Sequence, residues 1–288
     1  MAIAERELRD VAGEVAGLDA LDAFDAGPPR RARLWRSAWP KLAAIVLGLG
    51  IWQAVVWSRW KPDYVLPGPG TVLPRLGHEL GKATTWRALG ITGQRAGVGF
   101  AVSLVIGVVV GALVARSRIL RSAVGSFITG LQTMPSIAWF PLSILLFKLT
   151  DRAILFVVVL GAAPSIANGV ISGIDHIPPI LLRAGRVLGA RGLSSYRHVI
   201  LPAALPAFLA GLKQGWAFLW RSLMAGELFV MIANRPNVGL RLNQEFEMAD
   251  TVGLISWMLI VLVIGIVVDA FGFGLLERAV RRRRGLLS

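Results

Sequence analysis

Long apolar runs, separated by short polar segments, dominate the sequence. Six of these runs hold about 16 to 25 residues each, and they cover residues 42–57, 96–115, 123–147, 153–172, 199–223 and 253–276. A helix of roughly 17 to 25 apolar residues crosses a hydrocarbon layer about 30 Å thick. Helices also satisfy their own backbone polar groups, which a membrane interior requires. The pattern therefore predicts an all-α polytopic membrane protein with six transmembrane helices.

Prolines interrupt three of the six predicted spans. The third contains Pro135 and Pro141, the fourth Pro164, and the fifth Pro202 and Pro206. Such prolines are tolerated where neighbouring helices or a water-lined cavity satisfy the carbonyl groups that they leave free. We therefore expect discontinuous helices arranged around a path.

The composition agrees with a membrane location. Apolar residues make up 55% of the chain and charged residues 17%, whereas soluble domains carry about 25% charge. The absence of cysteine excludes a disulfide framework, a thiolate metal site and a cysteine nucleophile. The net charge of +14 comes from basic residues that flank the apolar runs, which is typical of membrane proteins. We therefore expect a lipid bilayer, and not a nucleic acid, around this chain.

The distribution of basic residues predicts the orientation. Of the 31 Lys and Arg residues, 19 lie in the N-terminal tail, segments 116–121 and 173–198, and the C-terminal tail. Only nine lie in the alternate segments 58–92, 148–152 and 224–252. Lys and Arg concentrate on the cytoplasmic side. Both termini are therefore predicted to be cytoplasmic.

Three segments are expected along the chain: a cytoplasmic N-terminal tail (1–40), a transmembrane domain (41–277, with a core at about 88–277) and a basic C-terminal tail (278–288). Residues 1–27 contain seven acidic residues but only two arginines, unlike a secretory signal, which has a basic start. Their apolar residues recur at helical spacing, so an amphipathic helix that binds a protein partner and a solvated tail both remain open.

The segment between spans four and five predicts a short surface helix. Pro178 and Pro179 can begin it, because the first turn needs no proline N–H, and Gly189 can end it. One face is apolar, with Ile180, Leu181, Ala184, Val187 and Leu188, and arginines surround it at 183, 186 and 191. Such a helix suits docking of a soluble partner, while an ordinary interfacial helix remains an alternative.

The same segment resembles the signature loop of ABC importer permeases, which reads Glu-Ala-Ala, three residues, Gly, nine residues, Ile, one residue, Leu-Pro. The corresponding positions here are Arg183, Ala184, Gly185, Gly189, Val199, Leu201 and Pro202. The spacing matches throughout, while arginine replaces the acid, glycine the second alanine and valine the isoleucine. Further stretches resemble the sulfonate, taurine and nitrate branch of this family: Leu66–Pro69, Met134–Leu142, Ile200–Pro206 and Ala225–Glu227.

The resemblance spans about residues 40 to 280 and implies a type I ABC importer permease fold with a cytoplasmic coupling helix between spans four and five. It implies a site in the bacterial cytoplasmic (inner) membrane, two cytoplasmic ATPase subunits that bind ATP and Mg, and an extracytoplasmic solute-binding protein. The implied solute is a small anion, most simply an aliphatic sulfonate or taurine, with nitrate or another small organic solute as alternatives. We expect a homodimer, since one bundle has too few spans to enclose a solute.

No ATP site or other cofactor site is expected in this chain. A phosphate-binding loop has four residues between its glycines and a hydroxyl residue after the lysine. The nearest stretch, Gly77–Ala83, has three residues between its glycines and ends in alanine. The histidines at 78, 176 and 198 lack metal-ligand spacing. ATP hydrolysis is therefore expected on a separate subunit.

Polar side chains inside the spans are candidates for the translocation path, because burying them in lipid is costly. The candidates are Gln132, Ser136, Asn168, Gln214, Arg221 and Glu227. Gln214 and Arg221 are seven residues apart and share one helix face. Structural alternatives remain: Lys213 extends to the inner interface, Glu227 pairs with an arginine, and Asp269 pairs with nearby arginines. Gly107 and Gly111 fit close helix packing in span two.

A membrane-embedded enzyme and an ion-coupled secondary transporter are the two other function classes that a polytopic membrane chain suggests. A membrane-embedded enzyme needs a nucleophile with a base, a metal cluster or paired carboxylates, and the sequence contains no such constellation. An ion-coupled secondary transporter favours internal repeats and several intramembrane acids, whereas here only Asp269 and Glu227 qualify. The sequence thus favours a non-enzymatic importer permease, with a secondary transporter as the alternative class.

Overall fold

The computed structural model describes residues 30–232 and 235–283. The predictions for residues 1–29 and for the end of the basic C-terminal tail therefore lie outside the described residues. The chain divides into two compact units, Met1–Asp63 and Tyr64–Ser288. In the first unit, helix α2 (Arg30–Trp57) is described, and its segment Trp39–Trp57 is apolar and long enough to cross a membrane. This segment corresponds to the first predicted span.

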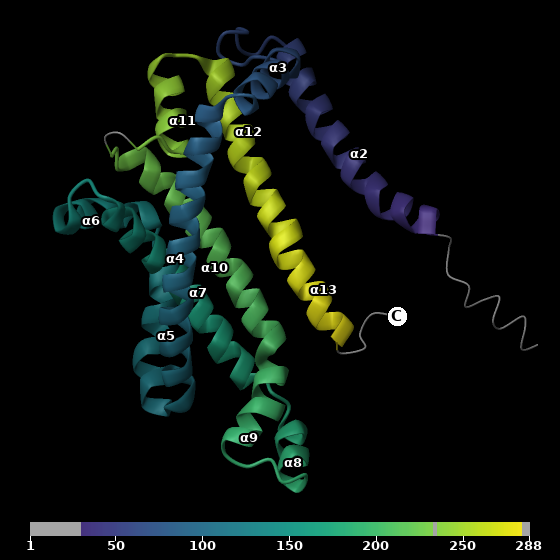
Figure 1. The fold of residues 1–288 in the computed structure, drawn as a ribbon, viewed down its shortest axis with the longest axis vertical. Coiled ribbons are helices and arrows are strands. Elements are labelled where there is room, and N and C mark those ends of the chain that lie inside the picture. Colours follow the sequence, from purple (N-terminus) through teal and green to yellow (C-terminus); the bar gives the residue numbers. More distant parts are fainter. Residues whose placement is uncertain (1–29, 233–234, 284–288) are drawn as a thin grey trace, which may run out of the picture. The chain divides into compact units, whose positions relative to one another are not determined.

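The second unit is helical throughout its described residues (Figure 1). The long helices are α4 (Ala83–Arg116), α5 (Arg118–Thr133), α7 (Asp151–Asp175), α10 (Leu201–Phe229) and α12 (Thr251–Val267). Shorter helices connect them: α3 (Pro69–Leu80), α6 (Phe140–Phe147), α8 (Pro179–Val187), α9 (Leu193–Ser195), α11 (Val238–Glu247) and α13 (Gly274–Arg283). Helices α3 and α11 lie at one end of this unit, called here the α11 end, and α8 and α9 lie at the other, the α8 end (Figure 1).

Four continuous helical segments of this unit are long and apolar enough to span a membrane: Ala83–Arg116, Asp151–Asp175, Leu193–Phe229 and Thr251–Val280. The second of the six predicted spans was too short, since its helix begins at Ala83. The first turns of α4 carry threonines, Arg87 and Arg95, so an apolar run does not reveal them. All-helical architecture with five or six candidate spans is confirmed.

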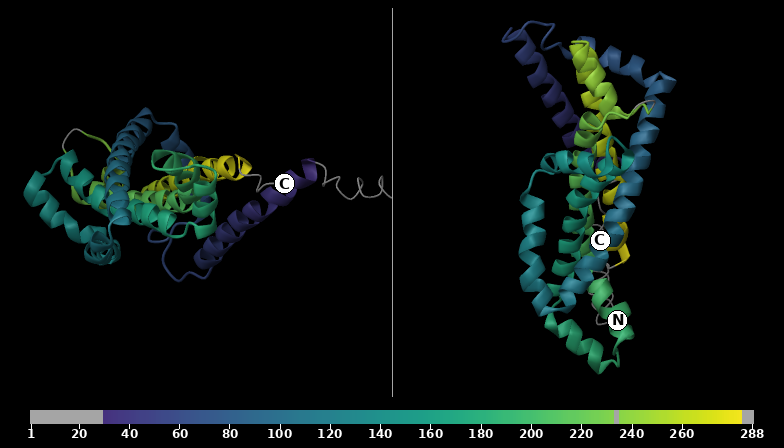
Figure 2. Two further views of the ribbon diagram at one scale, coloured as in Figure 1. Left: turned by 90° about the horizontal axis from the view of Figure 1, so that it is seen from below. Right: turned by 90° about the vertical axis from the view of Figure 1, so that its left-hand side faces the viewer.

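The third predicted span is not one helix. The chain bends by 101° between Ile119–Thr133 and Ser136–Phe147, and α6 then runs across the bundle (Figure 2). Met134 is extended, with ψ of 127°, because the ring of the following Pro135 disfavours the helical conformation there. Prolines 164 and 206, by contrast, lie inside the continuous helices α7 and α10. The expected discontinuity therefore occurs in one span and is absent from these two helices.

Small residues bring α4, α7 and α10 into close contact. A Cβ placed at Gly107 would lie 2.7 Å from the Cβ of Ile166, and one at Gly111 would lie 2.8 Å from the carbonyl oxygen of Ala167. The close packing predicted for these two glycines is confirmed. On the other side of α7, a Cβ at Gly169 would lie 2.7 Å from the Cα of Gly211 on α10. At these glycines, the backbone of α7 therefore lies directly against the backbones of α4 and α10.

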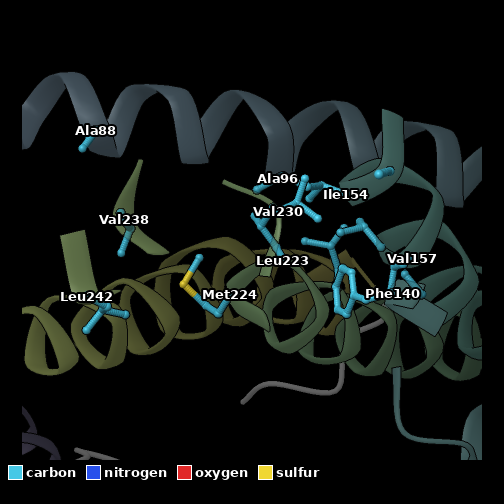
Figure 3. Packing of buried hydrophobic residues seen from close by; sticks show 14 of the residues in the cluster. Ala88, Ala96, Phe140, Ile154, Val157, Leu223, Met224, Val230, Val238 and Leu242 are labelled. Carbon is cyan, nitrogen blue, oxygen red and sulfur yellow. The ribbon is translucent and has the colours of Figure 1, made fainter. Parts of the chain in front are cut away.

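The apolar core lies along these contacts towards the α11 end. Figure 3 shows side chains of α4, α7 and α10 meeting there, including Ala96, Ile154 and Leu223. Phe140 from α6, Val230 from the segment after α10, and Val238 and Leu242 from α11 belong to the same cluster (Figure 3). This packing places the ends of four elements within one buried region, where the polar side chains described below also lie.

Gly211→Ala should destabilise the protein by about 1–3 kcal/mol, because the added methyl group meets the backbone of α7 and forces the helices apart. The thermal midpoint of the purified chain measures this effect. Gly97→Ala in α4 is the matched control, since nothing lies within 4 Å of a Cβ at that position. Equal midpoints for the two variants would contradict the close α7–α10 contact.

Candidate functional site

One face of α10 carries polar side chains that the described residues of this unit leave uncovered. Its exposed residues recur every three or four positions: Pro206, Ala210, Gln214, Ala217 and Arg221. Residues at this spacing share one face of a helix. The buried positions alternate with them and include Leu209, Leu212, Leu219 and Leu223. Gln214 and Arg221 therefore lie together on an open surface of a membrane-spanning helix.

Arg221 has no carboxylate partner among the described residues. Its Nε donates to the carbonyl oxygen of Ala217 at 3.2 Å, and its Cζ lies 4.6 Å from the ring centre of Phe218. The pair with Glu227 considered from the sequence is absent, since Glu227 binds a different arginine. An arginine within a membrane-spanning helix is unfavourable where its side chain faces lipid. Its guanidinium must therefore face water, solute or another protein surface.

Two of the remaining polar candidates lie on elements that contact α10. Ser136 begins the 3₁₀ turn Ser136–Trp139, which contacts both α7 and α10, and Asn168 lies in α7. Gln132 lies in the last turn of α5, which packs against α4 and α7, and its amide nitrogen is buried without a hydrogen-bond partner. All three are half-buried. Among the described residues, no hydrogen bond joins them to Gln214 or Arg221, so the structure does not bring these side chains together.

Lys213, next to Gln214, forms an ion pair. Its Nζ lies 3.0 Å from Oδ1 of Asp269, and both side chains are partly exposed. Asp269 belongs to a π-helical turn, Val268–Phe273, between α12 and α13. Asp269 thus has the structural role expected for it, but its partner among the described side chains is a lysine and not an arginine. The lysine is nearer because α10 and this turn pack together through Phe273 and Trp216.

Glu227, near the end of α10, is fully buried. Its Oε1 accepts from Nη1 of Arg95 at 2.8 Å, and its two oxygens accept from the hydroxyl of Thr92 at 3.0 and 2.9 Å. The backbone N–H of Gly239, in the first turn of α11, donates to Oε2 at 3.1 Å. The arginine-paired alternative for Glu227 is thus the arrangement observed. Its carboxylate faces no open surface of this chain.

The pair extends into a network at the α11 end. Nε of Arg95 donates to Oδ1 of Asp151, at the start of α7, at 2.8 Å. Oδ2 of Asp151 accepts from Nη1 of Arg235 at 2.9 Å. Thr92 also accepts from the N–H of Val238 at 3.1 Å. Charged groups therefore join α4, α7 and α10 to the segment that leads into α11.

Sequence reasoning did not assign roles to Arg95, Thr92 and Asp151. A usable signal was present, because a charge within an apolar helix requires a partner, and both Arg95 and Glu227 are such charges. They are 132 positions apart in the sequence, which gave no indication that they meet. The close packing of α4, α7 and α10 brings them together.

The surface helix after span four forms as predicted. Helix α8 begins at Pro179, and Gly189 follows it with φ of +81°, in the left-handed region that glycine adopts without strain. Val187 and Leu188, together with Leu193 beyond the turn, are at least 85% exposed. The helix thus presents apolar side chains that no described residue covers.

Two positions of the signature loop contact each other. Gly185 is buried, and a Cβ placed there would lie 2.7 Å from Cγ2 of Val199. The N–H of Ala190 donates to the carbonyl oxygen of Gly185 at 2.8 Å and closes the turn. Glycine at position 185 therefore fits the close approach of Val199. Arg183 points to no acidic partner among the described residues, and Leu201 and Pro202 begin α10.

An ion pair connects this loop region to α5. Nη2 of Arg121 lies 2.8 Å from Oδ1 of Asp175, the last residue of α7. A carboxylate at the C-terminus of a helix is unfavourable unless a cation offsets it. Arg121 supplies that cation from the first turns of α5. The helix that leads to the 101° bend is thereby tied to the chain just before α8.

A second charged cluster joins α3, α11 and α12 at the α11 end. Arg75 lies 3.2 Å from both Oε1 of Glu79 and Oδ2 of Asp250. Burial raises the pKa of Glu245, and the neighbouring Asp250 raises it further, while Arg75 opposes both. A raised carboxyl pKa favours folding at low pH, and that contribution is lost as the pH rises through the raised value.

Comparison with known proteins places these features in a family. The family described as binding-protein-dependent transport system inner membrane component matches residues 103–282, more than half of the chain. The taurine transport system permease protein of Escherichia coli is 26% identical over 86% of this chain and 91% of its own. The aliphatic sulfonates permease of the same organism is 28% identical, over 71% and 77%. The nitrate import permease of Synechococcus elongatus is 27% identical, over 70% and 78%.

Two further comparisons concern coverage and fold. The chain spans 63% of the length of a putative ABC transporter permease from Methanocaldococcus jannaschii. A solved structure of the inward-facing MetNI methionine ABC transporter contains a chain that is 23% identical, with a TM-score of 0.54, over 68% of this chain and 93% of that one. This likeness confirms the type I importer permease fold.

The family match covers the signature loop, the polar face of α10 and the network residues Asp151 and Glu227, and it begins after Thr92 and Arg95. A permease is the membrane subunit of an ABC transporter and not its ATPase, so the prediction of a non-enzymatic chain is confirmed. This chain belongs to the family of binding-protein-dependent transport system inner membrane components, the multi-pass permease subunits of ABC importers.

Proposed function

We propose that this chain lines the path of an ATP-driven importer for a small anionic solute, an aliphatic sulfonate or taurine. The observation that carries the proposal is the polar face of α10, where Arg221 has no carboxylate partner in the described part of the chain and shares its face with Gln214. An unpaired guanidinium is suited to a sulfonate, whose oxygens accept charge-assisted hydrogen bonds. Relatives named for taurine, aliphatic sulfonates and nitrate support a solute with an anionic group.

A second copy of this chain completes the path. The polar face of α10 cannot be left in contact with lipid without a large cost, and one bundle leaves that face open. Two copies that turn these faces towards each other would enclose a polar channel. Ser136 and Asn168 lie on elements that contact α10 and would supply further hydrogen-bonding groups, and Gln132 would add its amide from α5.

Helix α8 couples the path to two cytoplasmic ATPase subunits, which bind ATP and Mg. Its exposed apolar residues Val187 and Leu188 provide the docking surface. An extracytoplasmic binding protein delivers solute at the α11 end. Both termini are cytoplasmic in this arrangement, in agreement with the distribution of Lys and Arg along the chain.

Purification and reconstitution test this function. We expect the chain to copurify as two copies with two ATPase subunits, and the complex in vesicles to accumulate taurine or an alkanesulfonate only when ATP and the binding protein are present. A single copy per complex would contradict the homodimer. Uptake driven by an ion gradient without ATP would support a secondary transporter instead. Nitrate and an uncharged amino acid of similar size are the comparison solutes.

Gly189→Val should uncouple ATP hydrolysis from transport by at least tenfold while membrane insertion stays normal. Valine is strained at φ of +81°, so the turn that ends α8 must change shape, although space around the residue is open. The number of solute molecules moved per ATP measures the effect. Gly189→Asn is the matched control, because asparagine tolerates the left-handed conformation. Unchanged transport in the valine variant would contradict the coupling role of this loop.

A further inference from the structure

A long apolar groove lies between α5 and the pair α4 and α7, which run alongside it (Figure 2). It encloses about 720 Å³, within the range of about 300–1,000 Å³ for ligand sites. Helix α5 contributes Val124, Phe127 and Leu131, and α7 contributes Leu155 and Val159. Every lining residue is apolar except one arginine. Apart from that arginine, the walls offer a hydrated or anionic solute no hydrogen-bonding side chain.

The groove differs at its two ends. Towards the α8 end it is closed, because Val114, Ile128 and Ala167 pack together across α4, α5 and α7. At the other end lies Arg152, in the first turn of α7. The stretch of α7 from Arg152 to Ala167 is about 22 Å long, at 1.5 Å per residue. Half of a hydrocarbon layer is roughly 15 Å deep, so the groove can hold the acyl chain of one leaflet.

Arg152, at the open end of the groove, carries a positive charge that no described carboxylate neutralises. Its side chain is exposed and has no hydrogen bond or ion pair among the described residues. The adjacent carboxylate, that of Asp151, is already shared by Arg95 and Arg235 at 2.8 and 2.9 Å. The charge of Arg152 is therefore free to bind an anion from outside the chain.

We propose that this groove binds one acyl chain of a membrane phospholipid, with the lipid phosphate held by Arg152. The apolar walls match a hydrocarbon chain, and a guanidinium binds phosphate through two parallel hydrogen bonds. A partner helix would fill the apolar groove, but it would leave the guanidinium of Arg152 without a bound anion. The bound lipid then supports α5, whose last residues lead directly into the 101° bend.

Photolabelling of the full chain tests this site. The chain is reconstituted in vesicles of phosphatidylethanolamine and phosphatidylglycerol, with a small fraction of phosphatidylglycerol that carries a diazirine near the end of one acyl chain. We expect the label on the peptides of α5 and α7 that line the groove. Arg152→Ala should lower this labelling at least fivefold, and Arg152→Lys should restore part of it, because lysine keeps the charge but not the paired geometry.

Two further variants make the outcome decisive. Arg87→Ala removes another exposed arginine, on α4 and outside the groove, and should leave the labelling unchanged. Val159→Trp fills the middle of the groove and should abolish it. Equal labelling in Arg152→Ala, or labels spread evenly over all lipid-facing helices, would show ordinary bilayer contact and overturn the site. Replacing Val159 by benzoylphenylalanine would overturn it too if irradiation gave a product of two chains instead of a lipid adduct.

Discussion

Glu227→Ala is expected to destabilise the protein by about 3–5 kcal/mol, the range for removing one partner of a buried ion pair. The guanidinium of Arg95 is only 5% exposed and would lose its contact with Oε1 of Glu227 at 2.8 Å. Thr92 and the N–H of Gly239 would also lose their acceptor. The thermal midpoint and the yield of assembled complex should fall together.

Glu247→Ala is the matched control for this effect. Glu247 is an exposed carboxylate of α11 that accepts one hydrogen bond, from Asn243, so its loss should change stability by well under about 1 kcal/mol. Replacing both members of the buried pair by apolar residues, Arg95→Met with Glu227→Leu, should recover part of the loss, since no charge is then left unpaired. A Glu227→Ala protein as stable as the control would contradict the role given to this network.

Arg221→Ala is expected to lower anion uptake by roughly tenfold or more, while the amount of assembled complex stays near normal. A hydrogen bond to a charged group contributes about 1.5–3 kcal/mol, and tenfold corresponds to about 1.4 kcal/mol. Assembly should survive because, among the described residues, the guanidinium has no ion pair and its one hydrogen bond is to the carbonyl oxygen of Ala217, four residues away on the same helix.

Uptake of labelled solute into vesicles and the yield of complex after purification measure the two quantities separately. Arg221→Lys should retain part of the uptake, because it keeps the charge without the planar donor pair. Lys213→Ala removes a neighbouring cation that is already paired with Asp269, and it should affect uptake less. If uptake and assembly fall in step in Arg221→Ala, the arginine has a structural role and the anion path loses its main support.

Arg221 and Glu227 show what the sequence and the helix packing each contribute to the site. Both residues are polar positions in one apolar span, and the sequence alone ranked them together as path candidates. Their surroundings differ completely: Glu227 is 0% exposed beside Arg95, whereas Arg221 is exposed. Helix packing made that distinction, because it turns one face of α10 inward and leaves the other uncovered.

Local signals determined the membrane class, the approximate spans, the surface helix from Pro179 with its turn at Gly189, and the closely packing glycines 107 and 111. Apolar run length and the conformational limits of proline and glycine act within a few residues, so a sequence displays them directly. The prolines of the third span likewise predicted a break in that span, and the structure adds its angle of 101°. Only the tertiary structure decided the pairing of Lys213 with Asp269 and the buried Arg95–Glu227 contact. These depend on which helix faces meet, and residues that lie 56 to 132 positions apart carry no local trace of their partners.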